Sequence, residues 1–241
     1  EKNKVILTKK LKGVTVIEGF PGIGLVGTIA TGFLIDHLDC EKIGTYFFEN
    51  PATPSMIAIH ECKLVDPIGI FYNKKHNLVL IHAITSAAGQ EWQAADLIID
   101  VCRQVTAKEL ITIEGVGSTD QVPTKEAGAF YFTKDKQSAK KLESKGHRCL
   151  NEGIIVGSTA AILLKSPLKT TCMFAETHSK MPDSKAAAKI IELIDNYLGL
   201  KVDYKPLLKQ AEEFEKKLKT IVTQGQKVQD LRQKKKFDYI G

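Results

Sequence analysis

The chain has 241 residues, of which 43% are hydrophobic and 26% are charged, and its formal net charge is +6. This composition excludes fibrous and disorder-dominated classes, and the length is enough for one sizeable α/β body with an appendage. Residues 205–241 hold ten basic and five acidic residues, so the rest of the chain is nearly neutral. Because the lysines of this basic tail are mixed with acids and lack interleaved aromatics, we expect no nucleic-acid binding.

The cysteines and the hydropathy pattern indicate the cellular compartment of the protein. The five cysteines form no C-x-x-C pair, so their spacing predicts neither a zinc site nor a redox couple, and we expect most of them to be buried thiols in a reducing cytosol. They are Cys40, Cys62, Cys102, Cys149 and Cys172. No stretch approaches the roughly 20 apolar residues of a membrane span. The first ten residues lack the apolar run of a signal peptide. We therefore expect a cytoplasmic protein that binds no membrane.

The first third of the chain reads as a strand, a glycine turn, a helix and further strands. Residues 14–18 are a β-branched run, 19–27 are rich in glycine, and a helix-like stretch extends to about Leu38. Further strands are predicted at 43–49, 56–61, 68–72 and 78–83. The turn-like residues 73–77 join the last two of these, so we expect a hairpin.

Strand and helix alternate over the next part of the chain. Apolar positions with helical spacing predict a helix at 91–106, and 183–198 has the same pattern after Asp183 or Ser184, either of which suits an N-cap. Strands are predicted at 109–114, 130–133 and 171–176, a polar helix at 136–144, and either a strand or a helix start at 154–164. This alternation predicts one domain over residues 1–200, a three-layer α/β architecture in which helices flank a mixed sheet.

The pattern changes after Gly199. Apolar residues follow a 4-3-4-3 spacing at Leu207, Ala211, Phe214, Leu218 and Ile221. This seam lasts only about three heptads, so we expect a C-terminal helix at 201–223 that packs on its own body or on a neighbouring subunit. Residues 224–241 are expected to form a flexible basic tail.

The tail ends in an apolar tip formed by Phe237, Tyr239, Ile240 and Gly241. Two aromatics and an aliphatic at the end of a solvated segment cannot build a core, which favours insertion of this tip into a pocket of another protein. The alternative is a frayed terminus, or one that folds back on its own domain.

The glycines Gly22, Gly24 and Gly27 match the pattern G-x-G-x-x-G between a predicted strand and a predicted helix. In that context, backbone N–H groups and the helix N-terminus can hold a phosphate. Against this, Pro21 interrupts the entry to the turn, and no carboxylate stands clearly at the end of a second parallel strand. We favour the alternative that these glycines permit a tight turn and close packing of helix on strand.

Other polar residues give weaker signals. His60, Cys62, His82, Glu176 and His178 lack the short spacing that metal sites favour, so we predict neither a metal nor any other cofactor. Ser86 follows a strand without a G-x-S-x-G elbow, and no catalytic residue is assigned.

Four separated motifs carry a family resemblance. They are EGFPGIGLVG at 18–27, EGV at 114–116, GIIVG at 153–157 and PDSKAA at 182–187. In this order they resemble the archaeal branch of the proteasome assembly chaperone family over about residues 5–200. The resemblance implies a fold similar to the nucleoside phosphorylase and hydrolase type without an established catalytic site. It also implies a role in assembling the 20S proteasome core by binding its α-subunits.

The resemblance also gives a meaning to the tail. Such chaperones and proteasome activators can end in a hydrophobic-Tyr-any motif that inserts between adjacent α-subunits, whereas here Tyr239 is third from the end and Ile240 is penultimate. Either the tip is a displaced variant, or the tail does not use that pocket.

The expected partners are 20S α-subunits, further copies of the chain in a ring-like homo-oligomer, and a paralogous chaperone as an additional candidate. The competing hypothesis is a nucleoside or nucleotide enzyme that uses the Gly22–Gly27 turn for phosphate and the loop near Gly117 for the base or sugar.

Overall fold

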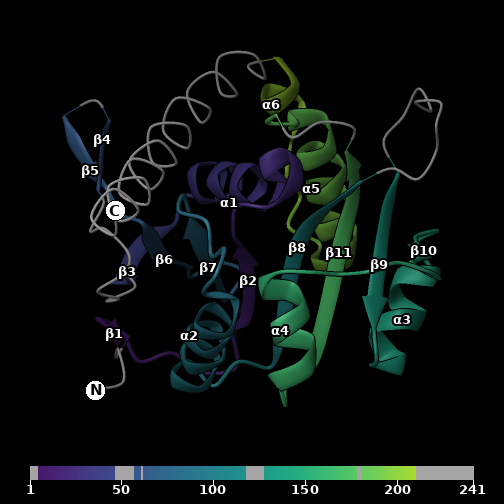
Figure 1. Ribbon diagram of the computed structural model, residues 1–241, viewed down its shortest axis with the longest axis horizontal. Helices are drawn as coiled ribbons and strands as arrows, with labels where there is room; N and C mark the ends of the chain where they lie inside the picture. The colour runs from purple at the N-terminus through teal and green to yellow at the C-terminus, as the bar shows by residue number, and fades with distance from the viewer. Residues whose placement is uncertain (1–4, 47–56, 61, 118–127, 178–180, 210–241) are drawn as a thin grey trace, which may run out of the picture.

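The computed structural model describes residues 5–46, 57–60, 62–117, 128–177 and 181–209. Its centre is a nine-stranded mixed sheet with helices on both faces (Figure 1). The strand order is β1-β3-β6-β7-β2-β8-β11-β9-β10. This arrangement confirms the predicted three-layer α/β architecture with a mixed sheet. The likeness to nucleoside phosphorylases stays a prediction.

The strands of the large sheet are β1 (Ile6–Leu7), β2 (Thr15–Gly19), β3 (Glu41–Tyr46), β6 (Ile68–Asn73), β7 (Leu78–Ala83), β8 (Glu109–Gly117), β9 (Ala129–Thr133), β10 (Arg148–Cys149) and β11 (Thr170–Thr177). The four central strands β7, β2, β8 and β11 run parallel to one another. Helices cover these strands on both faces, which explains why they read as continuous apolar runs. β6 and β7 form the predicted antiparallel hairpin.

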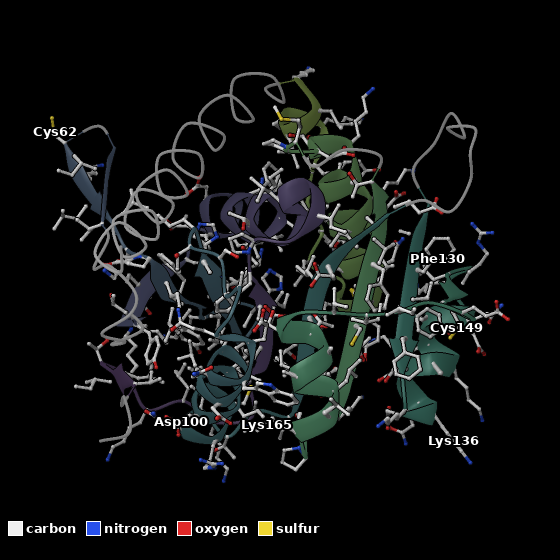
Figure 2. All side chains as sticks on the ribbon, in the orientation of Figure 1. Cys62, Asp100, Phe130, Lys136, Cys149 and Lys165 are labelled. Carbon is white, nitrogen blue, oxygen red and sulfur yellow. The ribbon has the colours of Figure 1, made fainter. Side chains whose placement is uncertain are left out.

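The helices are α1 (Val26–His37), α2 (Glu91–Gln104), α3 (Lys136–Glu143), α4 (Ser158–Lys165), α5 (Ser184–Leu198) and α6 (Lys205–Lys209), with a 3-10 turn at Ile23–Leu25. Alternate residues of β2 face opposite layers. Ile17 packs with the apolar residues of α1 and α5, whereas Val16 packs with those of α2 and α4. The side chains of both layers fill the space between sheet and helices (Figure 2).

Helix α5 begins and ends where the sequence predicts. The Asp183 carboxylate accepts a hydrogen bond of 2.9 Å from the backbone N–H of Ala186, which satisfies one of the free donors of the first turn. At the other end Gly199 has a φ of 72°, a left-handed conformation that glycine adopts without strain. These two residues fix the length of the helix.

The sequence analysis did not predict three of the observed strands, because a strand of two or three residues is too short to show an alternating hydrophobic pattern. β1 and β10 lie at the edges of the large sheet, and β5 (Lys63–Val65) pairs with β4 (Ala58–His60) in a separate hairpin. The undecided stretch 154–164 contains helix α4, which an irregular segment precedes. β8 runs three residues beyond the predicted strand end at Glu114.

The expectation that most cysteines are buried is wrong. Cys102 and Cys172 are buried and Cys40 is half-buried, but Cys62 and Cys149 are exposed. The two exposed thiols belong to minor elements, because Cys62 lies in the β4–β5 hairpin and Cys149 lies in the two-residue edge strand β10. Both are labelled in Figure 2.

The predicted C-terminal helix is described only at its start. In α6, Leu207 is buried and joins the apolar cluster that contains the inner face of α5. The remainder of the predicted helix 201–223, the tail 224–241 and its tip at Phe237, Tyr239, Ile240 and Gly241 lie outside the described residues.

Candidate functional site: a cavity at the ends of the parallel strands

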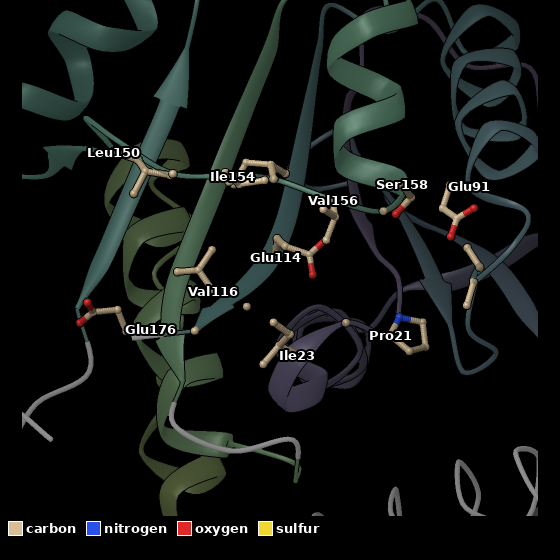
Figure 3. A pocket seen from close by; sticks show the side chains of 18 of the residues that line it. Pro21, Ile23, Glu91, Glu114, Val116, Leu150, Ile154, Val156, Ser158 and Glu176 are labelled. Atoms are coloured by element: carbon tan, nitrogen blue, oxygen red, sulfur yellow. The ribbon is translucent and has the colours of Figure 1, made fainter. Parts of the chain in front are cut away.

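A cavity of about 740 Å³ lies at the carboxyl ends of the central parallel strands (Figure 3). The segments that follow β2 and β7, together with the last residues of β8 and β11, form its walls. After β2, helix α1 connects the chain to β3, which lies on one side of β2 in the sheet. After β7, helix α2 connects it to β8, on the other side of β2, so the two connections run in opposite directions. This is a topological switch point, the place where open α/β sheets commonly bind ligands. Residues 150–157 run along the remaining side.

The glycine turn after β2 is packed directly against β8 and β11. A Cβ atom at Gly22 would lie 2.0 Å from Glu114 Oε1, and one at Gly115 would lie 2.0 Å from the carbonyl oxygen of Ile23. Gly24 has a φ of 67°, and a Cβ atom there would lie 2.7 Å from Thr177 Oγ1. Close approach and a left-handed backbone therefore account for the glycines at these positions. The space against Gly22 already holds a carboxyl group.

The lining of the cavity is apolar and acidic. Its carboxylates are Glu91, Glu114, Glu152 and Glu176, and none of its described lining residues is Lys, Arg or His. Its apolar side chains include Ile23, Val116, Phe130, Leu150, Ile154 and Val156. No cationic side chain of the described wall balances these carboxylates, which favours a positive over a negative charge on a ligand.

Glu114, near the end of β8, is the lining carboxyl that contacts α4. Thr159 of α4 donates a hydrogen bond of 3.2 Å from Oγ1 to Glu114 Oε2. Burial raises the pKa of Glu114 to about 7, although the hydrogen bonds from Thr159 and from the backbone of Gly115 act in the opposite direction. Near neutral pH this side chain therefore exists in both protonation states.

A second carboxyl lies deeper, on the same face of the sheet. Glu18 of β2 is only 1% exposed and is the register partner of Thr112 in β8. Burial, together with the nearby Glu114, holds the pKa of Glu18 well above its usual range. The backbone of Phe20 offsets part of this rise, yet no contact to either oxygen meets hydrogen-bond geometry, and Thr112 Oγ1 also has no partner within the described residues.

Glu109, a buried carboxylate elsewhere in the molecule, has the well-formed hydrogen bonds that Glu18 lacks. Glu109 of β8 accepts hydrogen bonds from the Tyr197 hydroxyl at 2.6 Å and from Thr171 Oγ1 at 3.0 Å. Lys169 Nζ lies 3.9 Å from the same carboxylate oxygen. This network joins β8, β11 and α5 and is satisfied internally, so we assign it a structural role.

Of the residues considered for a metal site, His82, Cys62 and Glu176 are described, and they are not brought together. His82 faces α1, where its Nδ1 lies 2.9 Å from Thr31 Oγ1 and burial lowers its pKa to about 4. Cys62 is exposed on the β4–β5 hairpin, and Glu176 lines the cavity. The described part of the chain contains no group of three or more His, Cys, Asp or Glu residues that could hold a metal. His178 lies outside it.

Some of the other candidate site residues from the sequence lie at the cavity, and the rest belong to the C-terminal tail, outside the described residues. Gly22, Gly117 and Ser86 line the cavity, whereas the residues of the apolar tip lie outside the description. Sequence reasoning treated Glu114 only as part of a family motif and did not identify Phe130 or Glu152. An acidic residue before Gly-Val-Gly at the end of a buried strand is the signal that points to Glu114.

Two sets of large apolar side chains are exposed on the described surface. Beside the cavity, Ile154 is 92% exposed and Val156 is 71% exposed. On the β4–β5 hairpin, the register partners Ile59 and Leu64 are 73% and 67% exposed. Apolar groups clustered on a projecting element are typical of contact surfaces. Within the described residues no helix has the length and hydropathy of a membrane span.

Comparison with known proteins links this architecture to a family. The model of the PAC2 family matches residues 16–222. The structure of Pyrococcus furiosus PbaA, described as an archaeal homologue of proteasome-assembly chaperone, has a TM-score of 0.78 and 30% identity, over 93% of this chain and 98% of that one. The uncharacterized protein MJ0106 of Methanocaldococcus jannaschii is 25% identical over 93% of this chain and 92% of its own length.

A third relative shares the fold at lower identity. Pyrococcus furiosus PbaB, described as an archaeal proteasome activator, has a TM-score of 0.72 and 20% identity over 92% of this chain and 99% of that one. The likeness to PbaA extends over nearly the full length of both chains, and the family model covers the central strands except the first residue of β2. These matches confirm the resemblance drawn from the four sequence motifs: the chain belongs to the PAC2 family and is similar in structure to an archaeal homologue of proteasome-assembly chaperone.

Proposed function

We propose that this protein is a cytoplasmic proteasome-assembly chaperone, or a chaperone-like factor, that binds 20S proteasome α-subunits. The observation that carries the proposal is the likeness to PbaA, which combines 30% identity with coverage of nearly the whole of both chains. Family membership supports a binding protein rather than an enzyme. In this account the folded body is a platform, and its work is done by contact with a multi-subunit client.

The β4–β5 hairpin supports a homo-oligomer as part of this proposal. An isolated two-stranded hairpin is at best marginally stable in water, and among the described strands this one pairs with none of the large sheet. It also carries Ile59 and Leu64 on its exposed surface. Packing against a second copy of the chain would bury both side chains and stabilise the hairpin.

The C-terminal tip would add to binding of the client. Burial of Tyr239 and Ile240 in a groove between subunits would contribute roughly 2 to 5 kcal/mol before the cost of ordering the tail. A single tip is therefore a weak anchor. Several tips on one oligomer would bind with higher avidity, because each bound tip raises the effective concentration of the next.

The alternative as a nucleotide enzyme has weaker support. Its phosphate would lie at the glycine turn, where the carboxyl of Glu114 occupies the space against Gly22. The cavity offers four carboxylates and no basic side chain among its described lining residues. A phosphate placed there would face uncompensated negative charge, which costs binding free energy.

The contribution of the tip is tested by substitution at constant tail length. We expect a triple variant, Phe237→Ala with Tyr239→Ala and Ile240→Ala, to retain at most a tenth of the affinity of the native chain for immobilised α-subunits. A tenfold loss corresponds to about 1.4 kcal/mol, well within the apolar burial proposed. Asp238→Ala, between the same residues, is the matched control and should bind as the native chain does. Equal affinity of the triple variant would exclude the tip as an anchor.

A further inference from the structure

The cavity at the strand ends has no part in the proposed contact with proteasome subunits. Its volume of about 740 Å³ lies within the range of small-molecule sites, and it occupies the switch point of the sheet. The segments that follow β2 and β7 and the ends of β8 and β11 surround it, while residues 150–157 close one side. Because it is walled on several sides, it suits a discrete small molecule better than a continuous polypeptide.

The chemistry of the wall selects the charge of that molecule. Figure 3 shows the labelled side chains of Glu114, Val116, Ile23 and Ile154 around one hollow. Glu91, Glu152 and Glu176 add three further carboxylates, and the described lining residues provide no cationic side chain to balance them. An anion would be repelled, whereas a cation with an apolar body would meet both kinds of surface.

Two carboxyls, that of Glu114 in the wall and that of Glu18 beneath it, indicate where a positive charge would lie. Glu114 has hydrogen bonds from Thr159 and from the backbone of Gly115, but no basic side chain contributes to its pKa shift. Glu18, next to it on the same sheet face, is 1% exposed, and apart from the weak influence of the Phe20 backbone neither of its oxygens has a contact of hydrogen-bond geometry within the described residues. Neither carboxyl has a basic side chain as its partner there, so a cationic ligand is the group that would pair with the ionised form of Glu114.

We propose that this cavity binds a small organic cation, whose protonated amine or guanidinium pairs with the Glu114 carboxylate while its apolar body contacts Ile23, Val116 and Ile154. A lysine or arginine side chain of a peptide would present the same head group. The volume of the cavity, about 740 Å³, suits the free molecule.

The first test is ligand binding by the full chain without any proteasome subunit, followed by calorimetry and thermal unfolding. Phenethylamine and agmatine are the cationic probes, 2-phenylethanol is the neutral analogue, and phenylacetate and AMP are the anionic ones. We expect the two cations to bind and to raise the melting temperature, since a ligand that binds only the native state stabilises it. Equal binding of 2-phenylethanol, or no binding of either cation, overturns the proposal. Binding of a lysine-containing peptide without either free cation also overturns it.

The second test locates the charge. Glu114→Gln keeps the shape of the side chain and should weaken binding of phenethylamine at least tenfold, whereas Glu192→Gln, on α5 in the opposite layer, should leave it unchanged. Val116→Trp should block binding by filling the cavity, which gives an independent reading if the Glu114 variant does not fold. Unchanged affinity in both cavity variants overturns the proposal.

The third test is the pH dependence of binding. The titratable groups on the elements around Glu114 are Glu18 of β2, Glu91 and Cys102 of α2, Cys172 and Glu176 of β11, and Glu152 of the crossing segment. Ionised Glu114 is the form that attracts a cation, so the affinity of the native chain should rise between pH 6 and pH 8. The rise should disappear in Glu114→Gln; a rise of the same size would contradict the assignment. All three tests omit proteasome subunits, so their failure leaves the proposed function untouched.

Discussion

At the scale of single residues, two glutamates of β8, Glu109 buried and Glu114 half-buried, differ because their partners differ. Glu109 accepts hydrogen bonds from Tyr197 and Thr171, with Lys169 nearby. Glu114 has Thr159 as a partner, and burial raises its pKa to about 7. The two carboxyls are five positions apart in one strand, so the alternation of side chains places them on opposite faces of the sheet. The sequence does not show which partners each one meets, because these come from tertiary contacts with α5 for Glu109 and with α4 for Glu114.

The raised pKa of Glu114 predicts a specific dependence of stability on pH. The folded-state pKa exceeds that of an unfolded glutamate, so its contribution to stability is fully present below about pH 4.5 and is lost as pH rises to about 7. We expect Glu114→Gln to lack this decline, so its stability relative to the native chain should increase from pH 4.5 to pH 8 by about 2 to 3 kcal/mol. Chemical unfolding at the two pH values measures this difference.

The control for this experiment is Glu192→Gln, which removes an exposed carboxylate of α5. It should unfold with the same pH dependence as the native chain, because no buried charge changes. If Glu114→Gln also followed the native pH dependence, the pKa of Glu114 would not be raised by folding, contrary to our account.

At the scale of elements, the glycine motif shows what sequence reasoning can and cannot supply. The order strand, turn, helix is visible in the sequence, and the structure places these elements at β2, the turn and α1. The sequence does not show that Gly22 adjoins the carboxyl of Glu114, 92 residues further along the chain, or that the backbone at Gly115 lies close to the carbonyl of Ile23. Those contacts depend on the position of β8 beside β2, which is a property of the whole sheet.

The long elements were predictable and the short ones were not. α2 and α5 carry clear helical periods, and the β6–β7 hairpin has two apolar strands around a polar turn. The edge strands β1 and β10 consist of two residues each, and the segment before α4 has no period to detect. The cavity was only partly foreseen for the same reason, since residues 150–157, which form one of its walls, are irregular.

Two glycines at the end of β8 give a matched test of close packing. Gly115→Ala places a Cβ atom 2.0 Å from the backbone oxygen of Ile23, whereas Gly117→Ala meets nothing within 4 Å. We expect the first substitution to cost on the order of 2 kcal/mol or more of unfolding free energy, because the turn must shift, and the second to stay within about 0.5 kcal/mol. Urea unfolding of both variants measures the difference. Equal stability would mean that the turn is not held against β8.

At the scale of the whole molecule, the body combines a stable centre with projecting apolar surfaces. The central strands and the helices of both layers bury two apolar clusters. The β4–β5 hairpin lies outside the large sheet and exposes Ile59 and Leu64. In our account the centre supplies stability, and the hairpin and the tail supply contacts with other chains.

The hairpin predicts how the oligomer can be broken. We expect Ile59→Glu with Leu64→Glu to lower the molar mass in light scattering to that of a single chain, because charged side chains would be buried at the interface. Lys63→Ser alters an exposed residue of the same hairpin and should leave the mass unchanged. Retention of the native mass by the double variant would show that the hairpin does not join the copies.

The association of this protein with proteasome α-subunits is the central claim, and native mass spectrometry of the two purified components tests it most directly. We predict a complex of defined stoichiometry that contains both this chain and α-subunits, and that forms without added nucleotide. Spectra in which the two components remain separate at concentrations where each is folded would contradict the account.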